Sequence, residues 1–287
     1  MIYIALSVVC SVIVSVLLKL ARPWQVDLRQ AIGGGYLIAS ALCLALLQPA
    51  PDLILRAPFS PAWFLLLALG VVLPAMFLVL ATSVDQVGIV RTDAAMRLSL
   101  LLPLVAAFTL FGEALTAQKG LGVAVGLVAI ACIVARHEDA AVPAHSPWKW
   151  PLIVFVGMGV IDIMFKLVAQ EAGVPFADIL FASFSLAFVL SVLYLAWCYS
   201  RGNARWSWRH AGGALLIGGF NFGNIVFYIQ AHRALSQDPA LVFSAMNIGV
   251  IVLATLVGVG LFRERLSRLN GVGLLLAVGA IAVLASA

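Results

Sequence analysis

The chain has 287 residues, of which 64% are hydrophobic and 10% are charged, and its mean hydropathy is +1.13. Soluble domains are usually about 45–50% apolar and about 25% charged, so this composition excludes an ordinary soluble domain. The high apolar content also excludes a disordered chain. A secreted disulfide scaffold is excluded because the four cysteines all lie inside apolar runs and have no CxxC spacing. The net charge of +5 is no nucleic-acid signal, since the basic residues cluster near the ends of apolar runs. The class that remains is a polytopic membrane protein.

Ten apolar runs, broken by proline, glycine and charge, follow one another along the chain. A membrane-spanning helix needs about 20 apolar residues, and continuous rather than alternating apolarity favours helices over barrel strands. The sequence therefore predicts an all-α fold with ten transmembrane helices. The predicted spans are 2–20, 30–48, 61–82, 88–111, 117–136, 150–170, 176–199, 210–232, 239–262 and 268–286. The first run has no basic leader or cleavage site, so we expect it to be retained as a helix.

The positions of Lys and Arg predict the orientation of the chain. Most of the 17 Lys and Arg residues lie in the loops that follow odd-numbered spans. Because positive charge favours the cytoplasmic side, we expect these loops in the cytoplasm and both termini outside it. The sequence thus predicts an integral, multi-pass protein of the plasma (inner) membrane.

The two halves of the sequence resemble each other. A polar segment, the predicted cytoplasmic linker 137–149, separates a half at 1–136 from a half at 150–287, and each half holds five predicted spans. An odd number of spans turns the second half upside down, which predicts a 5+5 inverted repeat of the kind found in transporters. Three short stretches recur in the same order, at 15–20 and 162–167, 94–98 and 244–248, and 112–116 and 263–267.

Two stretches resemble a known family. Residues 103–133 and 254–283 each run from a helix through a turn with a glutamate into a glycine-rich helix. In this respect the chain is similar to the drug/metabolite transporter superfamily, in its EamA-like ten-helix branch, and the resemblance covers nearly the whole chain. It implies secondary transport of small metabolites or drugs, with a cavity lined by the first four helices of each half and with the fifth helices peripheral. Arg263 departs from the small residue usual before the glutamate, which bears on the packing of that turn.

Arg97 is the first candidate for a substrate contact. It lies about nine residues into the fourth predicted span, where a charge costs about 2.5–3.5 kcal/mol and usually faces a cavity or a partner. A guanidinium there would bind a carboxylate or phosphate of a substrate. The alternative is an internal ion pair with Asp93, one helical turn earlier.

A polar face on the eighth predicted span supplies further candidates, because Asn221, Asn224 and Tyr228 follow one another at helical spacing. In the repeat, Asn247 occupies the place of Arg97. Hydrogen bonds between helices are the alternative role for these groups. We predict that five residues bind the substrate: Arg97, Asn221, Asn224, Tyr228 and Asn247. His232, next along the same face, is expected at the membrane surface.

Asp162 and Lys166 are the candidates for coupling transport to protons. They lie four residues apart on the sixth predicted span, so they share one face, and a buried carboxylate there can take up a proton. The alternative is a pair that neutralises itself. Glu113 and Glu264 each stand before a predicted helix, so we expect them to cap the exposed N–H groups of the helix that follows.

Proline interrupts two predicted spans, since Pro74 and Pro103 each remove a backbone donor inside an apolar run. Interrupted spans at matching places in two halves are typical of transporter binding sites and their gates. A static kink is the equal alternative.

The sequence as a whole predicts a secondary transporter, an exporter or facilitator that moves a small polar or amphipathic metabolite by alternating access, with an anionic substrate left open. Proton coupling and exchange are both open, and so are a monomer and a homodimer. The motifs GxxxxGK[ST], HExxH and GxSxG are absent from the sequence, so we expect neither an ATPase nor an enzyme, and no cofactor or metal. The alternative is a lipid-handling or structural membrane protein without solute transport.

Overall fold

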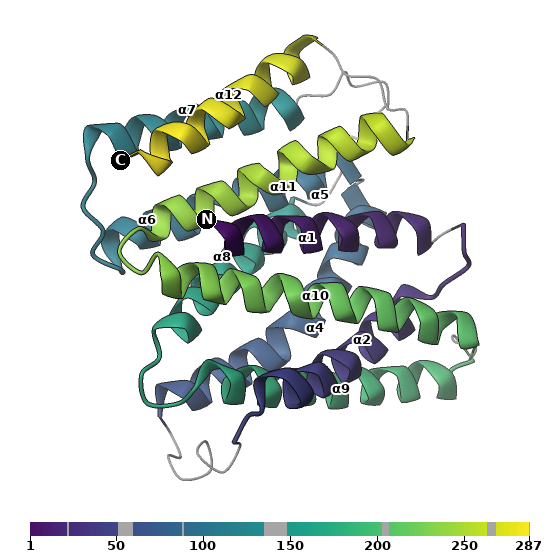
Figure 1. The fold of residues 1–287 in the computed structure, drawn as a ribbon. Coiled ribbons are helices and arrows are strands. Elements are labelled where there is room, and N and C mark those ends of the chain that lie inside the picture. The colour runs from purple at the N-terminus through teal and green to yellow at the C-terminus, as the bar shows by residue number, and fades with distance from the viewer. Residues whose placement is uncertain are drawn as a thin grey trace. The chain divides into compact units, whose positions relative to one another are not determined.

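A computed structural model describes residues 1–21, 23–50, 60–87, 89–134, 148–202, 207–262 and 268–286. Within these ranges the chain forms helices joined by turns, and no strand (Figure 1). The elements are α1 (Ile2–Ala21), α2 (Leu28–Leu42), the π-helix η1 (Cys43–Leu47), α4 (Pro61–Val87), α5 (Ile89–Leu98), α6 (Leu101–Thr109), α7 (Ala117–Val134), α8 (Lys149–Gln170), α9 (Phe176–Ser200), α10 (Trp208–Ala234), α11 (Pro239–Phe262) and α12 (Arg268–Ala285).

Seven helices in the described ranges are long and apolar enough to cross a membrane, counting α2 and η1 as one. Three shorter apolar stretches accompany them, at Ala95–Thr109, Ala117–Cys132 and Gly271–Ala285. The prediction of an all-helical, multi-pass membrane protein is thereby confirmed. Most of the predicted linker, 137–147, lies outside the described residues, and so does Glu264.

The helices group into two compact units. Unit 1 comprises Met1–Val8, Met76–Ile163 and Ala231–Ala287, and unit 2 comprises Val9–Ala75 and Met164–Gln230. Each unit takes segments from both halves of the predicted repeat, and α1, α4, α8 and α10 contribute residues to each. The division of the chain into halves at 137–149 stays a prediction.

In unit 2, small residues let α2 pack closely against α9 and α10. The hydroxyl oxygens of Ser40 and Ser185 lie 3.3 Å apart between α2 and α9. On α10, a Cβ added at Gly218 would lie 2.6 Å from the Cα of Gly35. Only glycine permits such an approach of two backbones. Close contact at small residues is one way in which uncharged helix faces associate in a membrane.

In unit 1, α7 and α12 lie side by side (Figure 1). A Cβ added at Gly122 would lie 2.7 Å from Cγ of Leu284, and Gln118 donates a hydrogen bond of 3.0 Å to the Ser286 hydroxyl. These two helices are the predicted fifth helices of the two halves, 117–136 and 268–286.

The fourth predicted span, 88–111, is not one helix, as we expected, but two. The helix α5 ends at Leu98, and α6 begins at Leu101. Pro103 explains the interruption, because it has no N–H to donate to the carbonyl of Ser99 four residues earlier. Instead the N–H of Leu102 donates to the Ser99 carbonyl at 3.0 Å, and the N–H of Leu100 donates to the Arg97 carbonyl at 3.3 Å, which makes a tight turn.

A left-handed residue closes α1. The N–H of Val26 donates to the Ala21 carbonyl at 2.9 Å across Gln25, whose φ is 55°. This six-to-one bond is that of a Schellman motif, which ends a helix and fixes the direction of the chain after it. It places Trp24 and Gln25 beside the first turns of α10, in unit 2.

Candidate functional site

The interruption between α5 and α6 lies against α8 in unit 1. Ser99 and Leu100 are 2% and 1% exposed, and Arg97 in the last turn of α5 is half-buried. A Cβ added at Gly159 of α8 would lie 3.0 Å from the Ser99 carbonyl oxygen. Asp162, half-buried, stands three residues further on, on the same side of α8 as Gly159. Unit 1 therefore brings the segments that carry Arg97 and Asp162 to one place.

The side chain of Asp93 lies outside the described part of the structure. The alternative ion pair between Arg97 and Asp93 therefore stays a prediction.

Asn247 and its neighbours on α11 form a second polar patch of unit 1. The Asn247 amide donates a hydrogen bond of 3.1 Å to the Phe243 carbonyl, four residues earlier on the same helix. The Ser244 hydroxyl is buried, and no other described residue hydrogen-bonds to it. The Asn247 side-chain nitrogen thus makes one hydrogen bond within α11.

His232, which we expected as a solvated residue at the membrane surface, is instead fully buried within the protein. The helix α10 continues to Ala234, and the ring of Phe243 on α11 covers the imidazole at a centroid distance of 4.6 Å. Sequence reasoning placed His232 at the surface because the apolar run ends there, and it had no means of knowing the residue that packs over it.

In unit 2, the polar face of α10 meets α8. Asn221 and Asn224 are half-buried and Tyr228 is buried. The rings of Phe165 and Tyr228 meet edge to face with centroids 6.2 Å apart. Lys166, next to Phe165, is fully buried. The candidate coupling residue Lys166 and the predicted substrate residue Tyr228 thus lie on two helices that touch.

The five predicted substrate-binding residues are divided between the units. Arg97 and Asn247 belong to unit 1, whereas Asn221, Asn224 and Tyr228 belong to unit 2. Their convergence on one cavity stays a prediction.

Glu113 caps a helix, but not the one we expected. Its side chain is 1% exposed, and its carboxylate accepts the N–H of Ala240 at 2.7 Å, in the first turn of α11 rather than of α7. Gly112, with φ at +69°, turns the chain just before the glutamate. The ammonium of Lys119 lies 2.8 Å from both Glu113 and Asp238, the residue that precedes Pro239 and α11. We name these three residues, Glu113, Lys119 and Asp238, the ionic cluster.

Sequence reasoning missed the ionic cluster because it counted Lys119 only as a loop cation. One local signal was present. Asp238 followed by Pro239 is typical of a helix start, whose free N–H groups attract a carboxylate. The sequence contains no sign of which carboxylate is used.

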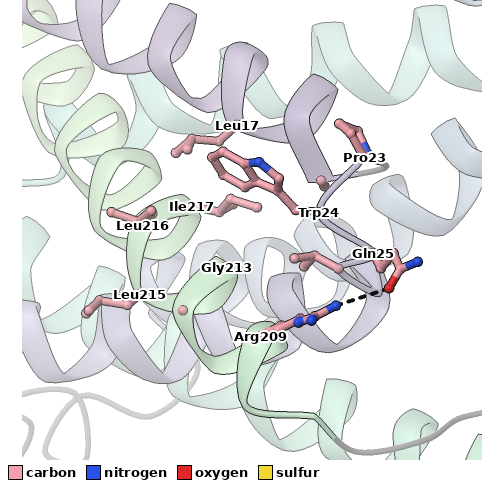
Figure 2. Close-up of a pocket in the computed structure, with 12 residues that line it drawn as sticks. Leu17, Pro23, Trp24, Gln25, Arg209, Gly213, Leu215, Leu216 and Ile217 are labelled. Atoms are coloured by element: carbon pink, nitrogen blue, oxygen red, sulfur yellow. Dashed lines mark hydrogen bonds between the residues drawn. The ribbon is translucent and has the colours of Figure 1, made fainter.

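A groove of about 730 Å³ lies in unit 2 and was also missed. The end of α1, the turn after it and the first turns of α10 line it (Figure 2). The Arg209 guanidinium donates a hydrogen bond of 3.1 Å to the Gln25 side chain. The sequence predicts these two segments only as ends of separate apolar runs, and no local pattern connects Gln25 with Arg209, which lies 184 positions away.

Beside the groove, Asp27 ties α2 to α10. Its N–H donates to Nδ1 of His210 at 3.2 Å, and its carboxylate pairs with the Arg29 guanidinium at 3.0 Å. Partial burial opposes the charge of this carboxylate, but hydrogen bonds from Arg29 and Gln30 and the charge of Arg29 outweigh it. The pKa of Asp27 is therefore held below its ordinary value.

These helices define an all-helical, multi-pass membrane protein. No family model matches the sequence. A Haemophilus influenzae protein described as uncharacterized is 39% identical over 282 residues, which cover 96% of this chain and 94% of that protein. The chain belongs to the same family as this protein. A crystal structure with 16% sequence identity matches 99% of this chain and 98% of its own with a TM-score of 0.70, a likeness of fold alone.

Proposed function

We propose that this protein is a secondary transporter of the inner membrane, an exporter or facilitator of a small polar or amphipathic metabolite with an anionic group. It belongs, in this proposal, to the EamA-like branch of the drug/metabolite transporter superfamily. Ten transmembrane helices form a 5+5 inverted repeat with both termini outside the cytoplasm. Transport proceeds by alternating access and draws on gradients rather than on ATP hydrolysis by this chain.

The interruption between α5 and α6 carries the proposal. Arg97 lies two residues before the buried Ser99 at this interruption, and Pro103 maintains it. Broken helices within a membrane offer backbone groups that no continuous helix offers, and transporters bind substrates at such places. A fixed guanidinium there suits a carboxylate or phosphate.

Two further observations support the proposal. Seven described helices are long and apolar enough to cross a membrane, and three shorter apolar stretches accompany them, which supports the proposal of ten spans. Lys166 is fully buried in α8, and an ionisable residue inside a membrane helix usually belongs to a substrate or ion pathway.

Each predicted residue has a task in this mechanism. Arg97 neutralises the anionic group of the substrate. Asp162, with Lys166 on the same helix, exchanges a proton during the cycle. Amide and hydroxyl groups bind the polar parts of the substrate, and they belong to Asn221, Asn224, Tyr228 and Asn247.

The test is a thermal-shift screen of purified protein against anionic metabolites, followed by counterflow of a hit in proteoliposomes. Wild type and Arg201→Gln, which lies at the exposed end of α9, should be stabilised equally. Arg97→Gln should lose the stabilisation and the flux. A hit that stabilises Arg97→Gln as much as wild type, or that binds without flux, contradicts the proposal.

The groove in unit 2 favours a second candidate, a lipid-handling membrane protein. Its walls are mostly apolar side chains at the end of a membrane helix. A dithionite assay with a fluorescent phospholipid in the same proteoliposomes separates the two functions. Lipid exchange between leaflets without solute flux would replace the transporter by this alternative.

A further inference from the structure

The groove in unit 2 combines apolar walls with a single cationic side chain. Leu17, Trp24, Leu216 and Ile217 form its apolar walls, and Arg209 is the cation. Trp24, Leu215 and Leu216 are 49%, 57% and 44% exposed, so much of their apolar surface is uncovered. Figure 2 shows the Arg209–Gln25 hydrogen bond at one end of the groove and Leu17 at the other.

Because the groove surrounds helix ends, we expect it at the level of the lipid headgroups. The helix α1 ends at Ala21 and α10 begins at Trp208, so the groove surrounds the ends of two membrane helices. Tryptophan side chains such as Trp24 and Trp208 collect at this depth, where their rings are apolar and their N–H groups are wet. An occupant would have one end in water and the other against hydrocarbon.

The charge of Arg209 is not neutralised by the described residues. Its side chain hydrogen-bonds to the neutral amide of Gln25, and no described carboxylate pairs with it. An exposed guanidinium above an apolar surface attracts a phosphate whose attached chains are apolar. Charge and surface are therefore complementary to an anionic amphiphile.

We propose that this groove binds an anionic phospholipid of the surrounding membrane. The phosphate is bound by Arg209, and one acyl chain lies along Leu17, Leu216 and Ile217. This site does not depend on transport, because every residue that lines it belongs to unit 2 and none belongs to the predicted substrate-binding set.

Two neighbouring glycines allow the site to be blocked without disturbing the fold. A Cβ added at Gly213 would lie 2.8 Å from Val26, so Gly213 is part of the packing between α10 and the turn after α1. A Cβ added at Gly212 would meet nothing within 4 Å. A leucine at position 212 therefore extends into the groove rather than into the protein.

The test is native mass spectrometry of delipidated protein, titrated with phosphatidylglycerol and with phosphatidylcholine of the same acyl chains. Wild type should bind phosphatidylglycerol several-fold more tightly than phosphatidylcholine. Arg209→Gln should lower the affinity for phosphatidylglycerol about fivefold, the effect of one cation near a membrane surface, and abolish the preference. Arg201→Gln, which changes a matched exposed cation at the end of α9, should behave as wild type.

Gly212→Leu should lose both lipids while its thermal unfolding in detergent stays that of wild type. Glycerol phosphate, which has the headgroup without the chains, should bind at least tenfold more weakly than phosphatidylglycerol. Equal affinity for the two lipids, an equal effect of Arg209→Gln and Arg201→Gln, or lipid binding unchanged in Gly212→Leu would overturn the proposal. If Gly212→Leu unfolds, the comparison of the two arginine variants decides alone.

Discussion

Helices are joined in two different ways in this molecule. In unit 2, Gly35 and Gly218 bring two backbones together, and a Cβ added at Gly218 would lie 2.6 Å from Gly35. In unit 1, the ionic cluster joins the turn before α7 to the start of α11 through contacts of 2.8 Å. One junction has no side chain at all, whereas the other depends on three charged side chains.

The difference follows from what each junction has to satisfy. The backbone groups of α2 and α10 are already bonded within their helices, so these helices need only close contact. The first N–H groups of α11 have no partner within the helix, and a carboxylate with a cation beside it satisfies them. Membrane helices therefore use small residues along their length and charges at their ends.

The strongest way to break the ionic cluster is Lys119→Met. This change leaves the Glu113 carboxylate, whose side chain is 1% exposed, without its cation. Removing one partner of a buried pair costs about 3–5 kcal/mol, so we expect the largest loss of thermal stability here. Thermal unfolding in detergent measures it.

The double variant Glu113→Gln with Lys119→Met serves as its control, because it removes the buried charge that the single change leaves behind. It should regain part of the lost stability. A single variant as stable as wild type would mean that the ionic cluster contributes nothing to unit 1.

The backbone junction is tested by Gly218→Ala. The added methyl group meets the Cα and carbonyl oxygen of Gly35, which cannot rotate away. Overpacking costs about 1–3 kcal/mol, and we expect the upper end of this range. The neighbour Gly219→Ala is the matched control, since its Cβ meets nothing within 4 Å, and it should keep or gain stability in the same unfolding experiment.

A third junction lies between these two kinds, where Gly159 meets the interruption of the fourth span. The methyl group of Gly159→Ala would lie 2.7 Å from the Leu102 side chain and 3.0 Å from the Ser99 carbonyl oxygen. The Cδ1 atom of Leu102 can rotate away, but its Cβ and the Ser99 carbonyl cannot, so we expect a loss of about 2 kcal/mol, the middle of the overpacking range. Gly260→Ala, where the Cβ has open space, is the control. Equal stabilities of the two variants would mean that Gly159 does not pack tightly against the interruption.

The smallest effect is expected from Asp27→Asn, which keeps the N-cap of α2 and removes its charge. Because the folded-state pKa of Asp27 lies below the ordinary 3.8, its contribution is complete above that pH and disappears as the pH falls through the lower folded value. A partly exposed pair is worth about 0.2–1 kcal/mol. The melting temperature of wild type should fall more steeply than that of Asp27→Asn on acidification below about pH 4. Parallel curves would show that the pair with Arg29 contributes nothing.

The sequence predicts the helices well and their contacts poorly. Hydropathy alone locates each apolar run, because twenty apolar residues in a membrane have few alternatives to a helix. It does not locate the interruption at Ser99, although Pro103 indicates that some break is present. The partner of Glu113 and the residue covering His232 come from distant parts of the chain, and no local pattern contains them.

The groove shows the same limit. Trp24 follows the first predicted span and Arg209 precedes the eighth, and no local pattern connects the two residues. Their proximity depends on the turn at Gln25, whose positive φ is unusual for a residue other than glycine. No local sequence pattern around position 25 predicts that positive φ.

The proline in the fourth span has a lasting consequence. Its ring is covalent, so position 103 has no N–H to donate to the Ser99 carbonyl whether or not a ligand is present and at any pH. Arg97 belongs to α5 and Leu102 to α6, and Ser99 lies between the two helices. A ligand bound to both α5 and α6 would therefore restrict their relative tilt, and its dissociation would remove that restriction.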